Sequence, residues 1–78
     1  VESVLDLCTG SGALAILAAR VFAYARIDAV ELSPDAAAVA RRNIDESGFA
    51  DRIELLQGDL FAPVKGRRYD LIITNPPY

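Results

Sequence analysis

The feature that most constrains the fold is a set of four short apolar runs spaced along the 78 residues. Each run is hydrophobic along nearly its whole length, rather than alternating between apolar and polar residues. That pattern is typical of strands covered on both faces, as in parallel sheets. We therefore predict strands over Val4–Leu7, Ile27–Leu32, Ile53–Leu56 and Tyr69–Thr74.

Helix signals fill the first two gaps between these runs. Gly12–Phe22 is rich in Ala, Leu and Ile and apolar almost all round, which predicts a helix that needs cover on its outer side too. The next helix begins with Ser33 as N-cap and Pro34 in its first turn. It ends at Gly48, which suits a left-handed C-terminal cap, with Phe49 as the hydrophobic contact. We expect Ala36, Ala40 and Ile44 to face inward, and Arg41, Arg42 and Glu46 to face outward.

Strands that alternate with helices predict an α/β fold with a parallel sheet and right-handed crossovers. The third connection, Gly58–Arg68, has room for at most one helical turn. If the strand order is 3-2-1-4, this connection must cross about 15 Å of sheet. Its residues can span about twice that distance, so the topology is feasible.

Composition narrows the function classes. A net charge of −3 and a pI near 4.7 argue against a general affinity for nucleic acid or anionic membranes. The basic cluster of Lys65, Arg67 and Arg68 is interpreted as a solvated loop. One cysteine and no histidine argue against an internal disulfide, histidine acid–base chemistry and a metal site. The longest apolar stretch, Ala13–Ala19, is too short to span a membrane, and we expect a cytoplasmic protein.

The first predicted strand leads into a glycine-containing turn. The stretch LDLCTGSGALA places Gly10, Gly12 and Ala15 in the pattern G-x-G-x-x-A, which permits a tight turn and a close approach of ligand to backbone. Glu31 ends the second strand, where its carboxylate can accept hydrogen bonds from both hydroxyls of a ribose. Together they indicate an adenosine-containing cofactor at the carboxyl ends of the strands. The alternative is a purely structural turn in which Glu31 caps a strand end.

Residues after the third strand extend this candidate site. Asp59 is expected in the same crevice, where its carboxylate would accept a hydrogen bond from an adenine amine or, alternatively, cap the next segment as an Asx turn. Leu60 and Phe61 are expected either to pack against the adenine face or to belong to the core.

The last predicted strand stops at Thr74-Asn75-Pro76-Pro77-Tyr78. Two adjacent prolines cannot extend a strand, because neither has a backbone N–H. An asparagine, two rigid carbonyl-bearing residues and a tyrosine are thereby presented at the end of the strand.

Taken together, these motifs resemble those of class I S-adenosylmethionine-dependent methyltransferases, and more narrowly the amino-methyltransferases marked by N-P-P-Y. The runs VLDLCTGSG, DLF and YDLIITNPPY are most similar to bacterial protein-glutamine methyltransferases, which act on release factors and on a large-subunit ribosomal protein. The cysteine in the glycine loop favours similarity to the enzyme that acts on the ribosomal protein, because many release-factor enzymes have glycine at that position. The resemblance implies a Rossmann-like, doubly wound sheet, with residues 1–78 as a partial catalytic domain that runs from the cofactor-binding half through N-P-P-Y.

The same resemblance implies a role for each site residue. The glycine loop would contact S-adenosylmethionine, and later its product S-adenosylhomocysteine, through Asp6, Cys8, Thr9, Gly10, Ser11 and Gly12. Glu31 would hold the ribose hydroxyls, Asp59 and Leu60 would contact adenine, and Asn75 would lie between cofactor and substrate. Cys8 has no histidine partner and is interpreted as a small core residue rather than a nucleophile.

The chemistry of amide methylation explains why N-P-P-Y suits this role. A glutamine amide nitrogen is a poor nucleophile that carries two N–H donors, which the Asn75 side-chain oxygen and the Pro76 carbonyl can accept while positive charge builds on the nitrogen. Pro77 would stiffen the backbone, and Tyr78 would offer a flat surface to the substrate. The expected partner is a ribosomal protein or release factor. Methylation of the adenine amine in DNA or RNA, and a module that binds cofactor without turnover, remain alternatives. The glycine loop would also permit an NAD-dependent oxidoreductase, but N-P-P-Y has no role in such an enzyme.

Overall fold

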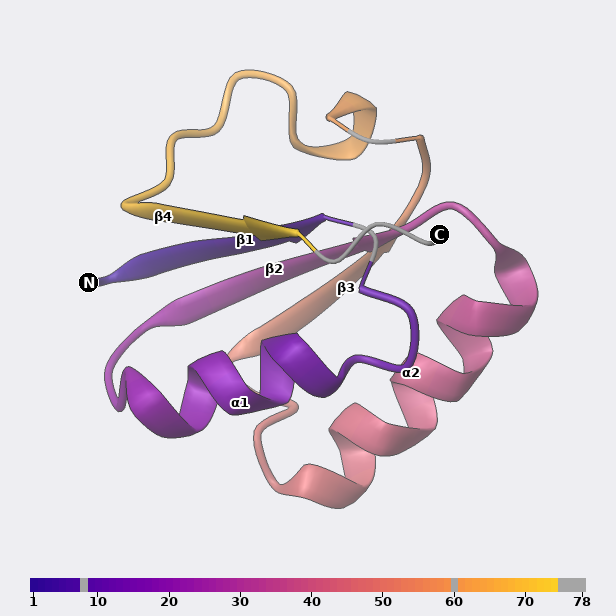
Figure 1. Cartoon of the computed structure of the whole chain (residues 1–78), viewed down its shortest axis with the longest axis horizontal. Coiled ribbons are helices and arrows are strands. Elements are labelled where there is room, and N and C mark those ends of the chain that lie inside the picture. Colours follow the sequence, from indigo (N-terminus) through magenta and orange to yellow (C-terminus); the bar gives the residue numbers. More distant parts are fainter. Residues whose placement is uncertain (8, 60, 75–78) are drawn as a thin grey trace.

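The computed structural model describes residues 1–7, 9–59 and 61–74. Its elements follow the order strand, helix, strand, helix, strand, 3₁₀ turn, strand (Figure 1). Each begins and ends within two residues of the prediction. The largest difference is the last strand, which begins at Leu71 because Tyr69 and Asp70 use their side chains to anchor the preceding loop. The elements are β1 Ser3–Leu7, α1 Ala13–Val21, β2 Arg26–Glu31, α2 Pro34–Ser47, β3 Ile53–Gln57, η1 Ala62–Val64 and β4 Leu71–Thr74.

The four strands form one parallel sheet in the order β3-β2-β1-β4, which confirms the predicted topology. The chain steps from β1 to β2 and β3, then returns past β1 to add β4 on its other side. The strand order therefore reverses between β1 and β4. In open α/β sheets, ligands bind outside the carboxyl ends of the strands at such a switch point. Here it lies where Leu7 is paired with both Val30 and Thr74.

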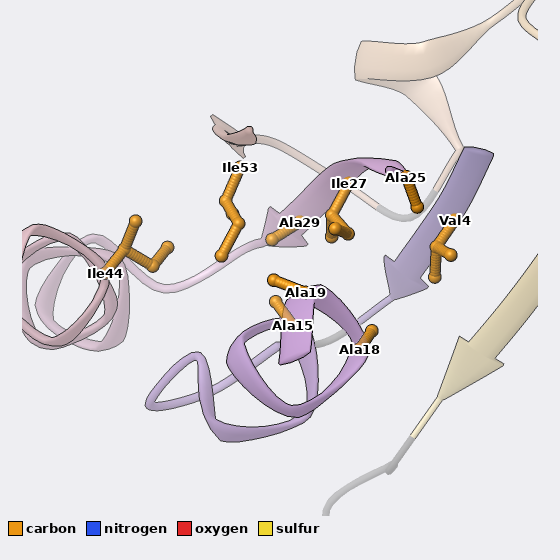
Figure 2. Packing of buried hydrophobic residues seen from close by; sticks show 9 residues of the cluster. All are labelled: Val4, Ala15, Ala18, Ala19, Ala25, Ile27, Ala29, Ile44 and Ile53. Carbon is orange, nitrogen blue, oxygen red and sulfur yellow. The ribbon is translucent and has the colours of Figure 1, made fainter. Parts of the chain in front are cut away.

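The two faces of the sheet are covered differently. α1 and α2 lie over one face, and the connection from β3 to β4, with its single 3₁₀ turn, lies over the other (Figure 1). Figure 2 shows the alanines of α1 directed at the sheet. Small residues there allow the helix backbone to lie close to the strands. The buried hydrophobic cluster on the helix side comprises Val4, Ala15, Ala18, Ala19, Ala25, Ile27, Ala29, Ile44 and Ile53. A second cluster, on the other face, comprises Leu5, Leu7, Val30 and Val64.

Burial differs between central and edge strands. β1 is buried from Val4 to Leu7, as a strand covered on both faces should be. β4 instead alternates between half-buried and exposed residues, and Ile72 is 51% exposed. The expectation of double cover is therefore confirmed for β1 and wrong for both edge strands, because β3 and β4 each carry exposed residues that the helices and the β3–β4 connection do not cover.

The caps of α2 are as predicted. The Ser33 hydroxyl accepts a hydrogen bond from the Ala36 N–H at 3.3 Å, and Gly48 is left-handed with φ 84°. The inner face differs by one position, because Ala36 is only half-buried and Ala37 joins Ala40 and Ile44 in the core. Phe49 packs against the core, and Arg41, Arg42 and Glu46 are exposed, as expected.

The outer side of α1 is apolar and largely open, as its sequence predicts. Leu17 is 54% exposed and Val21 is 63% exposed. Leu14, Leu17, Ala18, Val21 and Phe22 line a groove of about 190 Å³ with Leu71 and Ile73 of β4. Within the described ranges, neither helix has the length and continuous apolar character that crossing a bilayer requires.

Candidate active site

The glycine loop connects β1 to α1 at the switch point. Gly10 and Gly12 both have positive φ, 57° and 85° respectively, a backbone conformation that residues other than glycine rarely adopt. The loop is closed by a hydrogen bond from the Gly12 N–H to the Thr9 carbonyl (2.9 Å), and the Thr9 N–H donates to the Val30 carbonyl (2.9 Å). Among the described residues, a Cβ at Gly10 would have nothing within 4 Å, whereas one at Gly12 would lie 3.5 Å from the Cβ of Ala40. The loop is therefore open at Gly10 and packed against α2 at Gly12.

Glu31 joins the glycine loop to the start of α2. Its Oε1 accepts a hydrogen bond from the Gly10 N–H at 2.7 Å, and its Oε2 accepts one from the Ser33 N–H at 3.0 Å. A carboxylate has about four lone-pair positions, so each oxygen can accept one more hydrogen bond. The sequence-predicted pair of glycine loop and strand-end acid is thus brought together by the fold.

Asp6 lies beneath the loop and is fully buried. Its Oδ2 accepts a hydrogen bond from the Thr9 hydroxyl at 2.6 Å, while Oδ1 has no partner among the described residues. Burial raises the pKa of Asp6, and the charge of Glu31 adds to the rise, whereas the Thr9 hydroxyl and the backbone N–H of Ala15 lower it. Asp6 therefore holds the loop from inside, through the Thr9 hydroxyl.

Sequence reasoning missed one contact to the loop. Asn43 on α2 donates from Nδ2 to the carbonyl of Ser11 at 2.8 Å. The available signal was an asparagine inside a helix, because that residue type disfavours helix interiors unless its side chain finds another role. Asn43 lies one turn after Ala40, which packs against Gly12.

The end of β3 contributes Asp59 and Phe61. Asp59 is exposed, and the Ala62 N–H donates to its backbone carbonyl (2.9 Å), so the described contacts contain no Asx cap. Phe61 is 54% exposed, so its assignment to the core is wrong, because the 3₁₀ turn that follows directs Val64 inward instead. The Gly58 N–H donates to the Glu31 carbonyl at 3.0 Å, which brings this segment beside the end of β2.

Several predicted site residues lie outside the described ranges. They are Cys8, Leu60, Asn75, Pro76, Pro77 and Tyr78. N-P-P-Y follows Thr74, and Thr74 pairs with Leu7 just before the glycine loop. The sheet register therefore places the end of β4, which N-P-P-Y follows in the sequence, beside the end of β1, which the glycine loop follows.

A second hollow lies apart from this loop, and the described residues offer no cluster of metal-binding side chains. A hollow of about 300 Å³ between α2 and β3 is lined by Pro34, Ala37, Ala38, Arg41, Leu55 and Gln57, none of which was predicted as a site residue. In the part of the chain that the structure describes, no three His, Cys, Asp or Glu side chains are grouped so that they could hold a metal ion.

Known proteins resemble the chain over its full length. A ribosomal protein uL3 glutamine methyltransferase of Bradyrhizobium diazoefficiens is 63% identical over 78 residues, which are 100% of this chain and 24% of that protein. One from Bordetella pertussis is 55% identical over 78 residues, 100% of this chain and 26% of that protein. The chain thus spans about a quarter of the length of these curated relatives.

A solved structure shares the fold. An RNA methyltransferase from Salinibacter ruber, in complex with S-adenosyl-L-homocysteine, superposes with a TM-score of 0.83 at 36% identity, covering 94% of this chain and 46% of that one. The parallel sheet, its order and its crossovers are those of Rossmann-like class I methyltransferases. The model of one family, described as the methyltransferase small domain, matches residues 1–78. Because that match covers the entire sequence, the chain belongs to the methyltransferase small domain family.

Proposed function

We propose that the protein transfers a methyl group from S-adenosylmethionine to the side-chain amide nitrogen of a glutamine in a ribosomal protein. The observation that carries this is Glu31, whose carboxylate meets Gly10 at the switch point and retains acceptor positions. The similarity to uL3 glutamine methyltransferases supports the substrate class. A release factor is the second protein substrate compatible with the sequence motifs.

The described residues fit the cofactor. Glu31 can accept one ribose hydroxyl on each oxygen while keeping its bonds to Gly10 and Ser33. The open side of Gly10 leaves room for a ligand against the backbone. Asp59 is exposed beside the end of β2, where an adenine amine could meet its carboxylate. Thr9, Ser11 and Gly12 complete the proposed cofactor loop, and Asp6 supports it from below.

Charge favours this cofactor over a dinucleotide. S-adenosylmethionine is a net cation, with positive sulfonium and amino groups and one carboxylate, whereas NAD carries a negatively charged pyrophosphate. In dinucleotide-binding folds the positive N-terminus of the first helix holds a pyrophosphate, whereas here the buried Asp6 carboxylate binds Thr9 of the loop that leads into that helix. Glu31 does not discriminate between the two, because dinucleotide-binding folds carry an acidic residue at the same strand end. Asp6 beneath the loop is the acidic residue that favours S-adenosylmethionine over a pyrophosphate.

The substrate side of the proposal rests on the residues after Thr74. The bound cofactor supplies a methyl group that its sulfonium already activates, so positioning of the nucleophile carries most of the catalysis. The Asn75 oxygen and the Pro76 carbonyl would accept the two N–H bonds of the amide and stabilise the charge that develops there. Pro77 would keep that carbonyl aimed, and Tyr78 would cover the planar amide.

A second candidate is methylation of the exocyclic amine of adenine in RNA or DNA. An adenine amine offers the same two N–H donors as a glutamine amide, and the similar Salinibacter ruber structure is that of an RNA methyltransferase. The net charge of −3 weighs against it, since nucleic-acid binding draws its affinity from basic residues. A ribosomal-protein substrate also fits a cytoplasmic location.

The test begins with calorimetric titration of the intact protein with S-adenosylhomocysteine and with NAD. We expect the first to bind and NAD to bind much more weakly. Methyl transfer from labelled S-adenosylmethionine is then measured on a glutamine-containing ribosomal protein, on its Gln→Asn variant, and on an adenine-containing oligonucleotide. Label on the parent protein alone supports the proposal. Label on the oligonucleotide alone would replace it with the second candidate.

A further inference from the structure

We propose that Asn43 is a positioning residue that holds the glycine loop in its cofactor-binding shape. This rests on the proposed function, because it assigns the residue a role in cofactor binding. Asn43 belongs to α2, and its side-chain hydrogen bond goes to the backbone carbonyl of Ser11 in the glycine loop. Its effect on the ligand would therefore pass through the loop backbone.

The loop depends on hydrogen bonds that fix the direction of its peptide units. The unit that joins Ser11 to Gly12 is held at both ends: the Ser11 carbonyl accepts from Asn43 at 2.8 Å, and the Gly12 N–H donates to the Thr9 carbonyl at 2.9 Å. The unit that joins Thr9 to Gly10 is also held at both ends, because the Gly10 N–H donates to Glu31 at 2.7 Å. The Gly10–Ser11 unit lies between these two and takes its direction from them.

This segment needs such restraint because of its composition. Gly10 and Gly12 flank Ser11, and glycine gives the backbone access to conformations that other residues rarely adopt. Removing the Asn43 donor leaves the Ser11–Gly12 unit held at one end only. Cofactor binding must then restore the loop shape, and a binding-competent state that is only partly populated weakens the apparent affinity.

The packing of α2 makes the contact possible. The Cα of Gly12 lies so close to Ala40 that an added Cβ would be 3.5 Å from the alanine Cβ, and Asn43 follows one helical turn later. Asparagine lowers helix propensity relative to alanine at an interior position. A purely structural preference would therefore favour alanine at position 43, whereas the loop contact needs the amide donor.

The test compares Asn43→Ala and Asn43→Asp in the intact protein, with Arg42→Ala as control. Aspartate keeps the shape of asparagine but replaces the donor with an acceptor, and Arg42 is an exposed neighbour on the same helix. We expect the dissociation constant for S-adenosylhomocysteine to rise about three- to tenfold in both Asn43 variants and to stay unchanged in the control. The KM for S-adenosylmethionine should rise in parallel, with kcat at saturating cofactor nearly unchanged. Asn43→Ala should not lower the unfolding midpoint.

Unchanged cofactor affinity in a folded Asn43→Asp protein would overturn the proposal, as would a loss of stability without a loss of affinity. A parent protein that fails to bind S-adenosylhomocysteine would instead refute the proposed function. Amide hydrogen exchange at Gly10 and Gly12 in the ligand-free protein tests the role of Asn43 without any cofactor, and so separately from the proposed function. Faster exchange in Asn43→Ala than in Arg42→Ala supports the role of Asn43 in holding the loop, and equal exchange contradicts it.

Discussion

The two ends of the sheet use the same kind of contact for different purposes. At the amino ends of the strands, the Arg52 guanidinium donates to the carbonyls of Ala19 (2.6 Å), Ala25 (3.0 Å) and Phe22 (3.1 Å), and so caps the end of α1. It also lies over the Phe49 ring at 5.1 Å. At the carboxyl ends, Glu31 and Asn43 likewise bind backbone groups, but those groups belong to an open loop.

The difference lies in what remains beside each contact. Arg52 ties the carbonyl of Ala19, in the last turn of α1, to those of Phe22 and Ala25 in the turn that follows, so its bonds complete the fold. Around Glu31, acceptor positions remain, and Gly10 next to it has open space where a side chain would be. In this protein, hydrogen bonds from a side chain to the backbone therefore indicate a candidate site where the bonded loop has free space beside it, as at Gly10, and indicate structural support where it does not, as at Arg52. Substitutions at the two ends should consequently affect different measurements.

The largest effect is expected at the carboxyl end, from Asn75→Ala. If its side-chain oxygen acts on the nitrogen that receives the methyl group, the interaction strengthens in the transition state, and its loss lowers kcat. We expect a fall on the order of 10²–10³-fold, as for removal of one oxyanion-hole donor, with a smaller change in cofactor affinity. Single-turnover rates with labelled methyl donor measure this.

Asn75→Asp is the companion variant, because it keeps an acceptor and discards the amide donors. It should retain more activity than Asn75→Ala. A full single-turnover rate for Asn75→Ala would mean that the asparagine only ends the strand.

Arg52→Ala probes the opposite end of the sheet. Three charge-assisted hydrogen bonds and the contact with Phe49 are lost, so we expect a decrease of about 2–3 kcal/mol in the free energy of unfolding. Denaturant unfolding of the intact protein measures it, with exposed Arg42→Ala as control. The cofactor dissociation constant should not change at temperatures where the variant is folded. A large loss of affinity would show that the two ends are not independent.

Glu31→Ala should show the reverse pattern. The variant would lose the two ribose hydrogen bonds that we propose, so cofactor binding should weaken by about 1–3 kcal/mol. The Gly10 and Ser33 N–H groups also lose their partner. Glu31→Gln, which keeps one acceptor oxygen, should lie between the parent and Glu31→Ala. Calorimetric titration with S-adenosylhomocysteine gives the three dissociation constants. Equal dissociation constants for the three proteins would mean that Glu31 does not bind the cofactor and only ends the strand.

The smallest effect is expected far from the loop, where Tyr69 and Arg67 both donate to Asp28, at 2.6 Å and 2.9 Å. Burial and the hydrogen bond to Asp28 raise the pKa of Tyr69 to about 12. A raised pKa in the folded state stabilises the protein below the unfolded value near pH 10, and this stabilisation is lost as the pH rises from about 10 to 12. Tyr69→Phe should remove this part of the alkaline loss of stability, measured by denaturant unfolding across that range. Tyr24→Phe is the control, because Tyr24 is 93% exposed and should leave the pH dependence intact.

Local patterns were enough to predict much of the fold. Continuous apolar runs predicted the strands, and Ser33, Pro34 and Gly48 predicted the limits of α2, because caps and periodicity depend on neighbouring residues. The predicted strand order placed β4 at an edge, but its apolar composition did not reveal that Ile72 would be exposed, because cover of a face depends on how far the neighbouring layers extend. Phe61 was ambiguous for a similar reason: an aromatic residue after a strand suits either a core or a ligand surface.

The sequence alone determined the strands, the caps, and the placement of Gly10, Gly12 and Glu31 at strand ends. It could not determine which polar groups would meet. The bond from Gly10 to Glu31 joins residues 21 apart, and that from Asn43 to Ser11 joins residues 32 apart. Such bonds depend on the register of β1 against β2 and on how closely α2 approaches Gly12. Hydrogen bonds require atoms placed to within a few tenths of an ångström, and only the packing of the whole domain fixes positions that finely.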